Sequence, residues 1–334
     1  MPTGIEHGTV TLVADGTAIE VTTLRRDVAT DGRRAVVAFT TDWGLDAMRR
    51  DFTVNAVYCD LGGRLFDPTG GLGDLARRRI RFIGDAATRI AEDYLRILRF
   101  FRFHAEIGRG PLDAEGLRAC GAHAGGLANI SRERIRRELL RLLAAPGAVP
   151  AINAMAAAGV LRAIGLRGFD DLALARLADI ETALGRPGDG LIRFAALALG
   201  PAGGAAEIAE AFRLSGDERD RLLALETGST ASLGPGMSND RLRELSYRLG
   251  RERLLDRLLM AWAASGAGAT HSGWSALHAE AAVFVPPEFP LSGRDLVALG
   301  TAPGPALGQA LARLETAWIA SGFTKSKDEL LKLG

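Results

Sequence analysis

Cysteine and histidine are scarce in this chain. Its 334 residues include two cysteines, Cys59 and Cys120, which form neither a C-x-x-C motif nor a ligand cluster. The five histidines likewise show no metal-ligand spacing. We therefore assign no metal to these residues and expect both cysteines to be reduced thiols in a cytosolic protein.

Long apolar runs are also missing. No stretch of about 18 apolar residues occurs, so no membrane span is expected. The first residues, Met1 to Gly4, have neither a basic nor an apolar region, so they do not predict a signal peptide. These features predict a cytoplasmic location.

Aromatic residues make up only 6% of the chain, and the formal net charge is +1. The core must therefore consist mostly of Ala, Leu, Ile and Val, and the overall charge neither demands nor excludes a nucleic-acid partner. Arginine is nevertheless clustered, which can steer a polyanion locally or simply cover solvated helix faces. The clusters are Arg77, Arg78, Arg79 and Arg81; Arg96, Arg99 and Arg102; and Arg132, Arg134, Arg136 and Arg137.

The first part of the chain has the pattern of β-structure. Two runs rich in β-branched residues, Thr9–Val13 and Ile19–Leu24, flank Asp15-Gly16 and predict a hairpin. A third apolar run, Val54–Tyr58, is also interpreted as β-structure.

From about Ala86 onward the pattern is helical. Residues 91–103 have helical apolar spacing, and Ser131 is predicted to cap a helix that begins near Arg132. Beyond Pro146 the sequence is nearly all Ala- and Leu-rich helix. A β-containing first part followed by an all-helical remainder is an α+β pattern.

Two polar segments suggest chemistry. In Arg49-Arg50-Asp51 with Asn55, guanidinium groups lie beside a carboxylate and an amide, a set that can hold a triphosphate and a ribose hydroxyl. The alternative is a surface salt-bridge cluster at the start of a strand.

The second segment is Glu92-Asp93-x-x-Arg96-x-x-Arg99-x-x-Arg102. Helical spacing would place Asp93 and Arg96 on nearly the same face. A carboxylate can accept from the exocyclic amino group of adenine or cytosine while a guanidinium donates to the ring nitrogen, whereas uracil and guanine present the reversed pattern. The alternative is an ordinary intrahelical ion pair.

The order of these and neighbouring motifs resembles the bacterial class of tRNA nucleotidyltransferases, the CCA-adding and poly(A) polymerase family. The resemblance covers roughly the first 140 residues. It implies a partial nucleotidyltransferase β-sheet head (1–85), a helical neck with the nucleotide-template helix (86–145), and an RNA-binding body (146–232) and tail (233–334). The motifs are Gly4–Val10, Glu20–Thr23, Arg49–Ala56, Phe66–Gly71, Glu92–Phe100 and Ile130–Ile135.

The resemblance further implies addition of CMP and AMP to the tRNA 3′ end from CTP and ATP, with Mg²⁺ as cofactor. Close variants are A-only or CC-only addition and poly(A) synthesis. Glu20 would be a catalytic carboxylate near the metal-binding aspartates of the family, although an exposed strand glutamate is the default interpretation. The implied nucleotide-binding residues are Arg50, Asp51, Asn55, Asp93, Arg96, Arg99 and Arg102, of which Arg99 and Arg102 would meet phosphates.

One family element has no counterpart. The sequence contains no D-x-D pair, which the family uses to hold two metal ions. We interpret the chain as beginning after that pair, and expect no metal ligands within it and little nucleotide addition by the chain alone. The competing hypothesis is a non-catalytic RNA-binding relative of the family; the sequence leaves the oligomeric state open.

Overall fold

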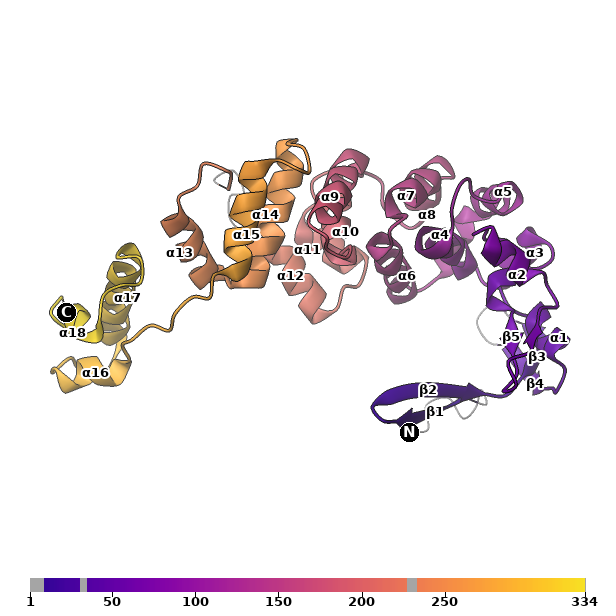
Figure 1. Cartoon of the computed structure of the whole chain (residues 1–334), viewed down its shortest axis with the longest axis horizontal. Coiled ribbons are helices and arrows are strands. Elements are labelled where there is room, and N and C mark those ends of the chain that lie inside the picture. The colour runs from indigo at the N-terminus through magenta and orange to yellow at the C-terminus, as the bar shows by residue number, and fades with distance from the viewer. Residues whose placement is uncertain (1–8, 31–34, 227–232, 334) are drawn as a thin grey trace. The chain divides into compact units, whose positions relative to one another are not determined.

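The computed structural model describes residues 9–30, 35–226 and 233–333. The chain divides into two compact units: unit 1 comprises residues 1–175 and 187–219, and unit 2 comprises residues 176–186 and 220–334. Small antiparallel ladders come first and helices follow (Figure 1), so the predicted α+β fold is confirmed. The finer division into head, neck, body and tail stays a prediction.

The predicted N-terminal hairpin is confirmed. Strands β1 (Thr9–Ala14) and β2 (Thr17–Thr22) pair antiparallel, from Thr9 opposite Thr22 to Ala14 opposite Thr17. The connecting residues Asp15 and Gly16 have φ of 50° and 76°. Positive φ at both central residues is the hallmark of the type I′ turn, whose twist matches that of paired strands.

Two further ladders complete the β-structure: β3 (Arg25–Thr30) with β4 (Ala35–Phe39), and β5 (Tyr58–Cys59) with β6 (Leu65–Phe66). The expectation of β-structure over Val54–Tyr58 was largely wrong.

Residues Thr53–Asn55 form a short 3₁₀ turn, and only Tyr58 of the predicted run lies in a strand. The Asn55 side-chain amide donates to the Asp51 carboxylate at 2.9 Å. This local side-chain bond favours a turn over an extended strand.

The helices of unit 1 enclose its core. Helix α4 packs against α6 and α7 (Figure 1), burying Leu98 and Phe101 on α4 and Ile135 on α6. The helical segments that begin in this unit are α1 (Trp43–Met48), α2 (Gly71–Ala76), α3 (Ala86–Glu92), α4 (Leu95–Ile107), α5 (Ala114–Ala122), η3 (Ala124–Asn129), α6 (Arg132–Ala144), α7 (Ala148–Ala157), α8 (Val160–Ala163), α9 (Asp171–Ala183), α10 (Gly190–Ala198), α11 (Ala205–Ala211) and α12 (Gly216–Glu226), of which α9 and α12 end in unit 2.

The expected single helix over residues 91–103 is broken. Helix α3 ends at Glu92, Asp93 is extended with φ of −156°, and α4 begins at Leu95. The Asp93 carboxylate accepts from the Leu95 amide at 3.1 Å, a local bond that competes with helix continuation. Helix α6 does begin at Arg132, but the Ser131 side chain makes no capping hydrogen bond.

The regular secondary structure in the described residues of unit 2 is all helical. Trp262 and Trp274 stack with ring centroids 6.0 Å apart, and Trp318 is buried in a second apolar cluster. None of the described helices is long and apolar enough to cross a bilayer. Its later helices are α13 (Asn239–Leu249), α14 (Arg251–Ser265), α15 (Ser272–Val283), α16 (Gly293–Ala298), α17 (Pro305–Ala320) and α18 (Lys327–Leu331).

An aromatic cluster fastens the 49–55 segment to α4. Phe52 is fully buried, and the centroid of its ring lies 4.9 Å from that of Phe82 and 5.4 Å from that of Phe103.

Phe52→Ala should therefore leave a cavity and destabilise unit 1 by about 3–5 kcal/mol. Urea unfolding followed by circular dichroism measures this loss.

The matched control for that substitution is Leu61→Ala, because Leu61 is fully exposed. This control should change the unfolding free energy by less than about 0.5 kcal/mol. Equal effects of the two substitutions would contradict the role assigned to the aromatic cluster.

Candidate nucleotide-binding site

A cavity of about 570 Å³ lies in unit 1, where the 49–55 segment faces the start of α4. Six arginines and two aspartates contribute to its walls, so the cavity is electropositive and suited to a polyanion. The lining residues are Thr22, Arg25, Arg49, Arg50, Asp51, Asn55, Asp93, Leu95, Arg96, Arg99, Phe103 and Arg134.

Asp46 does not line the cavity, but its buried carboxylate binds two of the arginines that do. Its carboxylate is only 1% exposed and accepts from the Arg49 Nη2 at 2.6 Å and the Arg50 Nε at 3.1 Å. It also accepts from the Arg25 amide and the Tyr58 hydroxyl, at 3.0 and 2.8 Å. Burial alone would raise the pKa of Asp46, but these hydrogen bonds outweigh burial and lower that pKa to about 2.

Arg50 is fixed on three sides while its guanidinium faces the cavity. Besides Asp46, it donates to the Asn55 carbonyl at 2.9 Å and lies 5.1 Å from the Tyr58 ring centroid, a cation–π distance. Burial and the bond to Asp46 raise the pKa of Tyr58 to about 12, so the phenol stays protonated.

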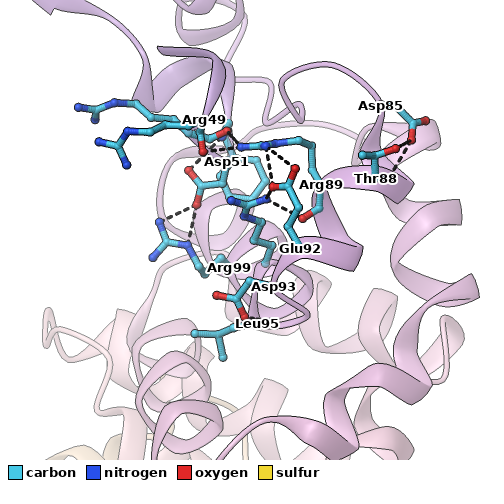
Figure 2. Close-up of polar contacts among 12 residues, drawn as sticks. Arg49, Asp51, Asp85, Thr88, Arg89, Glu92, Asp93, Leu95 and Arg99 are labelled. Carbon is cyan, nitrogen blue, oxygen red and sulfur yellow. Dashed lines mark hydrogen bonds and ion pairs between the residues drawn. The ribbon is translucent and has the colours of Figure 1, made fainter. Parts of the chain in front are cut away.

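Asp51 joins the 49–55 segment to α4. One carboxylate oxygen accepts from the Phe52 amide and the Asn55 side chain, and the other accepts from Arg99 Nε at 2.6 Å. Figure 2 shows this Arg99–Asp51 ion pair. Asp51 is 7% exposed, so it orients Asn55 and Arg99 along the wall while presenting little surface of its own.

Asp93 and Arg96 both line the cavity, but they are not ion-paired with each other. Asp93 Oδ2 accepts from Arg134 Nη2 at 2.6 Å, and Arg96 Nη1 donates to Glu92 and to the Arg89 carbonyl. Within the described part of the chain, the Arg96 Nε and Nη2 atoms have no hydrogen-bond partner. A carboxylate and a guanidinium with unused bonding capacity therefore share one wall.

Two family models match the chain: the poly(A) polymerase head domain over residues 1–81, and a probable RNA- and SrmB-binding site of polymerase A over residues 111–165. The mitochondrial CCA tRNA nucleotidyltransferase 1 of Danio rerio is 34% identical over 98% of this chain and 75% of its own length. The chain belongs to the CCA-adding and poly(A) polymerase family.

Two further comparisons agree with this membership. The CCA-adding enzyme of Geobacillus thermodenitrificans is 41% identical over 47% of this chain and 39% of its own length. The crystal structure of the Bacillus stearothermophilus CCA-adding enzyme in complex with CTP superposes with a TM-score of 0.70 at 29% identity. That superposition covers 96% of this chain and 78% of the other.

Within this family fold, two of the residues predicted from sequence lie away from the cavity. Arg102 is 1% exposed, donates to Glu138 and Glu106, each at 2.6 Å, and does not line the cavity, so its contact with phosphates stays a prediction that this geometry does not support. Its guanidinium is buried in the core between α4 and α6, where the carboxylate of Glu138 pairs with it.

Glu20 lies on the exposed β2 strand opposite Thr11 and does not line the cavity. The motif Gly4–Val10 falls mostly outside the described residues.

Sequence reasoning missed several contributors to the site. Asp46 precedes Arg49 and Arg50 by three and four residues, and this helical spacing was the available signal. Arg134 belonged to a recognised arginine cluster, but nothing local linked it to Asp93, 41 residues earlier. Arg25 had no signal, since its place depends on how β3 meets α1.

The lowered pKa of Asp46 predicts a specific pH dependence. A pKa depressed from 3.8 to about 2 contributes stability that is complete above the unfolded value and is lost as pH falls toward 2. Asp46→Asn should therefore cost about 2 kcal/mol at pH 7. The difference in unfolding free energy between wild type and Asp46→Asn, measured in urea, should stay constant above about pH 5 and become smaller below pH 4.

Asp60→Asn is the control for this experiment, because the Asp60–Arg64 pair lies at the surface, where water screens it. A pH-independent difference between wild type and Asp46→Asn would contradict the proposed role of the carboxylate.

Proposed function

We propose that this chain recognises CTP and ATP for the addition of CMP and AMP to the 3′ end of tRNA. The proposal rests on one observation: a single cavity has both an arginine-rich wall and the Asp93 and Arg96 side chains in its lining. The names of the relatives support it, as does the similar Bacillus stearothermophilus structure with CTP.

In this proposal the phosphates lie against the arginine-rich wall. Arg50 and Arg99 are both partly exposed, and each is oriented by a buried or nearly buried aspartate. Guanidinium groups held in this way donate paired hydrogen bonds to phosphate oxygens with little loss of side-chain entropy. Asn55, bonded to Asp51, is placed to meet a ribose hydroxyl.

The base would lie against Asp93 and Arg96. Asp93 accepts from the exocyclic amino group that adenine and cytosine share, and Arg96 donates to the adjacent ring nitrogen. Uracil and guanine would set donor against donor and acceptor against acceptor, leaving polar groups of the site unpaired. The turn between α3 and α4 supports this arrangement, because the Arg96 amide donates to the Asp93 carbonyl at 3.0 Å and the Asp93 side chain is held by Arg134.

Metal chemistry is not assigned to these residues. Enzymes of this family generally use a divalent metal, and we propose Mg²⁺ for the reaction. Among the described residues, however, no group of three or more Asp, Glu, His or Cys side chains could hold an ion, and Glu20 is away from the cavity. The described residues do not fit a two-metal site, so we derive no step through it.

The remaining parts of the proposal concern the wider chain. We propose that the helical regions 146–232 and 233–334 bind the tRNA, mainly through its phosphates. A cytoplasmic location also stays a proposal, since the vertebrate relatives are named as mitochondrial.

Nucleotide selectivity tests the base-reading residues. Asp93→Ala and Arg96→Ala should each lower the preference for CTP and ATP over UTP and GTP by about 1–3 kcal/mol, as for bidentate base contacts elsewhere. Isothermal titration of each variant with the four nucleotides measures the preference.

Arg134→Ala separates base reading from a structural ion pair. It removes the partner of Asp93 but keeps the carboxylate. Asp93→Ala and Arg134→Ala could both lose stability while Asp93→Ala keeps its selectivity for CTP and ATP. In that case the Asp93–Arg134 pair is structural and the base-reading proposal is wrong. Glu92→Ala should also weaken selectivity, because Glu92 accepts from Arg96.

Sequencing of extended ends tests the reaction. A tRNA transcript lacking its last three nucleotides, incubated with CTP, ATP and Mg²⁺, should gain CCA if the proposed reaction holds. A single A, CC or an A tail would identify the variant activities. Retained tRNA binding without any extension would favour the non-catalytic alternative and match the sequence-based expectation of little addition by this chain alone.

A further inference from the structure

Arg89 lies behind the cavity and does not line it. It is 8% exposed and lies on α3. Its Nη2 atom donates to the main-chain carbonyl of Arg49 (Figure 2) and to that of Arg50, the latter at 2.6 Å. These carbonyls are 40 and 39 residues earlier in the chain. Arg89 thus holds the backbone of the phosphate-facing segment, while Asp46 holds its side chains.

The same residue also contacts the base-facing wall. Arg89 Nη1 donates to both carboxylate oxygens of Glu92, at 2.9 and 2.6 Å. Glu92 in turn accepts from Arg96 Nη1, which also donates to the Arg89 carbonyl at 2.7 Å. One buried guanidinium and its own carbonyl therefore connect the Arg49–Arg50 backbone to the Arg96 side chain.

We propose that Arg89 is a positioning residue that couples the phosphate-binding and base-reading walls. The inference rests on the proposed function of the cavity. Arg89 touches neither phosphate nor base; it sets the relative position of Arg50 and Arg96. A planar guanidinium can serve two carbonyls and a carboxylate at fixed angles, whereas a lysine ammonium is a single point charge on a flexible stem.

The experiment compares Arg89→Lys with a matched control, Arg193→Lys. Arg193 is also a buried arginine of unit 1, and its Nη1 donates to the Leu143 and Ala145 carbonyls, away from the cavity. Each protein is titrated calorimetrically with CTP, UTP and inorganic tripolyphosphate, the last of which has no base. Thermal unfolding of each protein is recorded in parallel.

Arg89→Lys should weaken tripolyphosphate binding and lower the CTP-to-UTP affinity ratio, each by roughly five- to tenfold, as expected for misplaced charge-assisted hydrogen bonds. Arg193→Lys should lower the unfolding temperature but leave both quantities within about twofold of wild type, because its bonds lie away from the cavity. In an Arg96→Ala background, Arg89→Lys should still weaken tripolyphosphate binding but no longer change the CTP-to-UTP ratio. If Arg89→Lys does not fold, Arg89→Gln replaces it with the same expectations.

The outcomes separate this inference from the proposed function. If wild type does not distinguish CTP from UTP, the proposed function fails and the inference fails with it. If wild type does distinguish them but Arg89→Lys behaves like Arg193→Lys, only the inference is overturned. A change in tripolyphosphate binding with an unchanged CTP-to-UTP ratio also overturns it, because the two walls would then be independent.

Discussion

The buried carboxylate of Asp46 is the interaction on which the rest of the site depends. The guanidinium groups that line the cavity repel one another, and this repulsion destabilises the folded site. The repulsion is strongest when the cavity holds no anion. Asp46 offsets this repulsion by accepting from Arg49, Arg50, Tyr58 and the Arg25 amide at once. The carboxylate is nearly inaccessible, so its charge acts on the arginines and does not compete with a ligand.

The other acidic residues around the cavity follow the same arrangement. Asp51 holds Arg99 and Asn55, and Glu92 holds Arg89 and Arg96. Each carboxylate lies behind or beside the cations that it orients, which leaves the net charge of the cavity wall positive. Asp93 differs, since it lines the cavity with capacity for further hydrogen bonds, and it is the carboxylate placed to meet a base.

The walls also depend on apolar packing. Phe52 is adjacent to Asp51 in sequence and is buried against Phe82, Phe100 and Phe103. This aromatic cluster fixes the segment that carries Arg49, Arg50 and Asp51 onto α4, where Arg96 and Arg99 are located. Hydrogen bonds alone would set directions, but the packed rings set the separation between the two walls.

Local sequence determined much of this protein. The Asp15-Gly16 turn, the change to helix near Ala86 and the family motifs were all predictable, because neighbouring residues decide turn conformation and periodicity. The burial of Arg102 and the contacts of Arg89 and Arg134 were decided only by tertiary structure, whereas the break at Asp93 accompanies a local bond to the Leu95 amide. Each depends on groups brought together from separate elements or on a local bond stronger than helical periodicity. Residue types could identify a site for a nucleotide, but only packing determined which arginines face it.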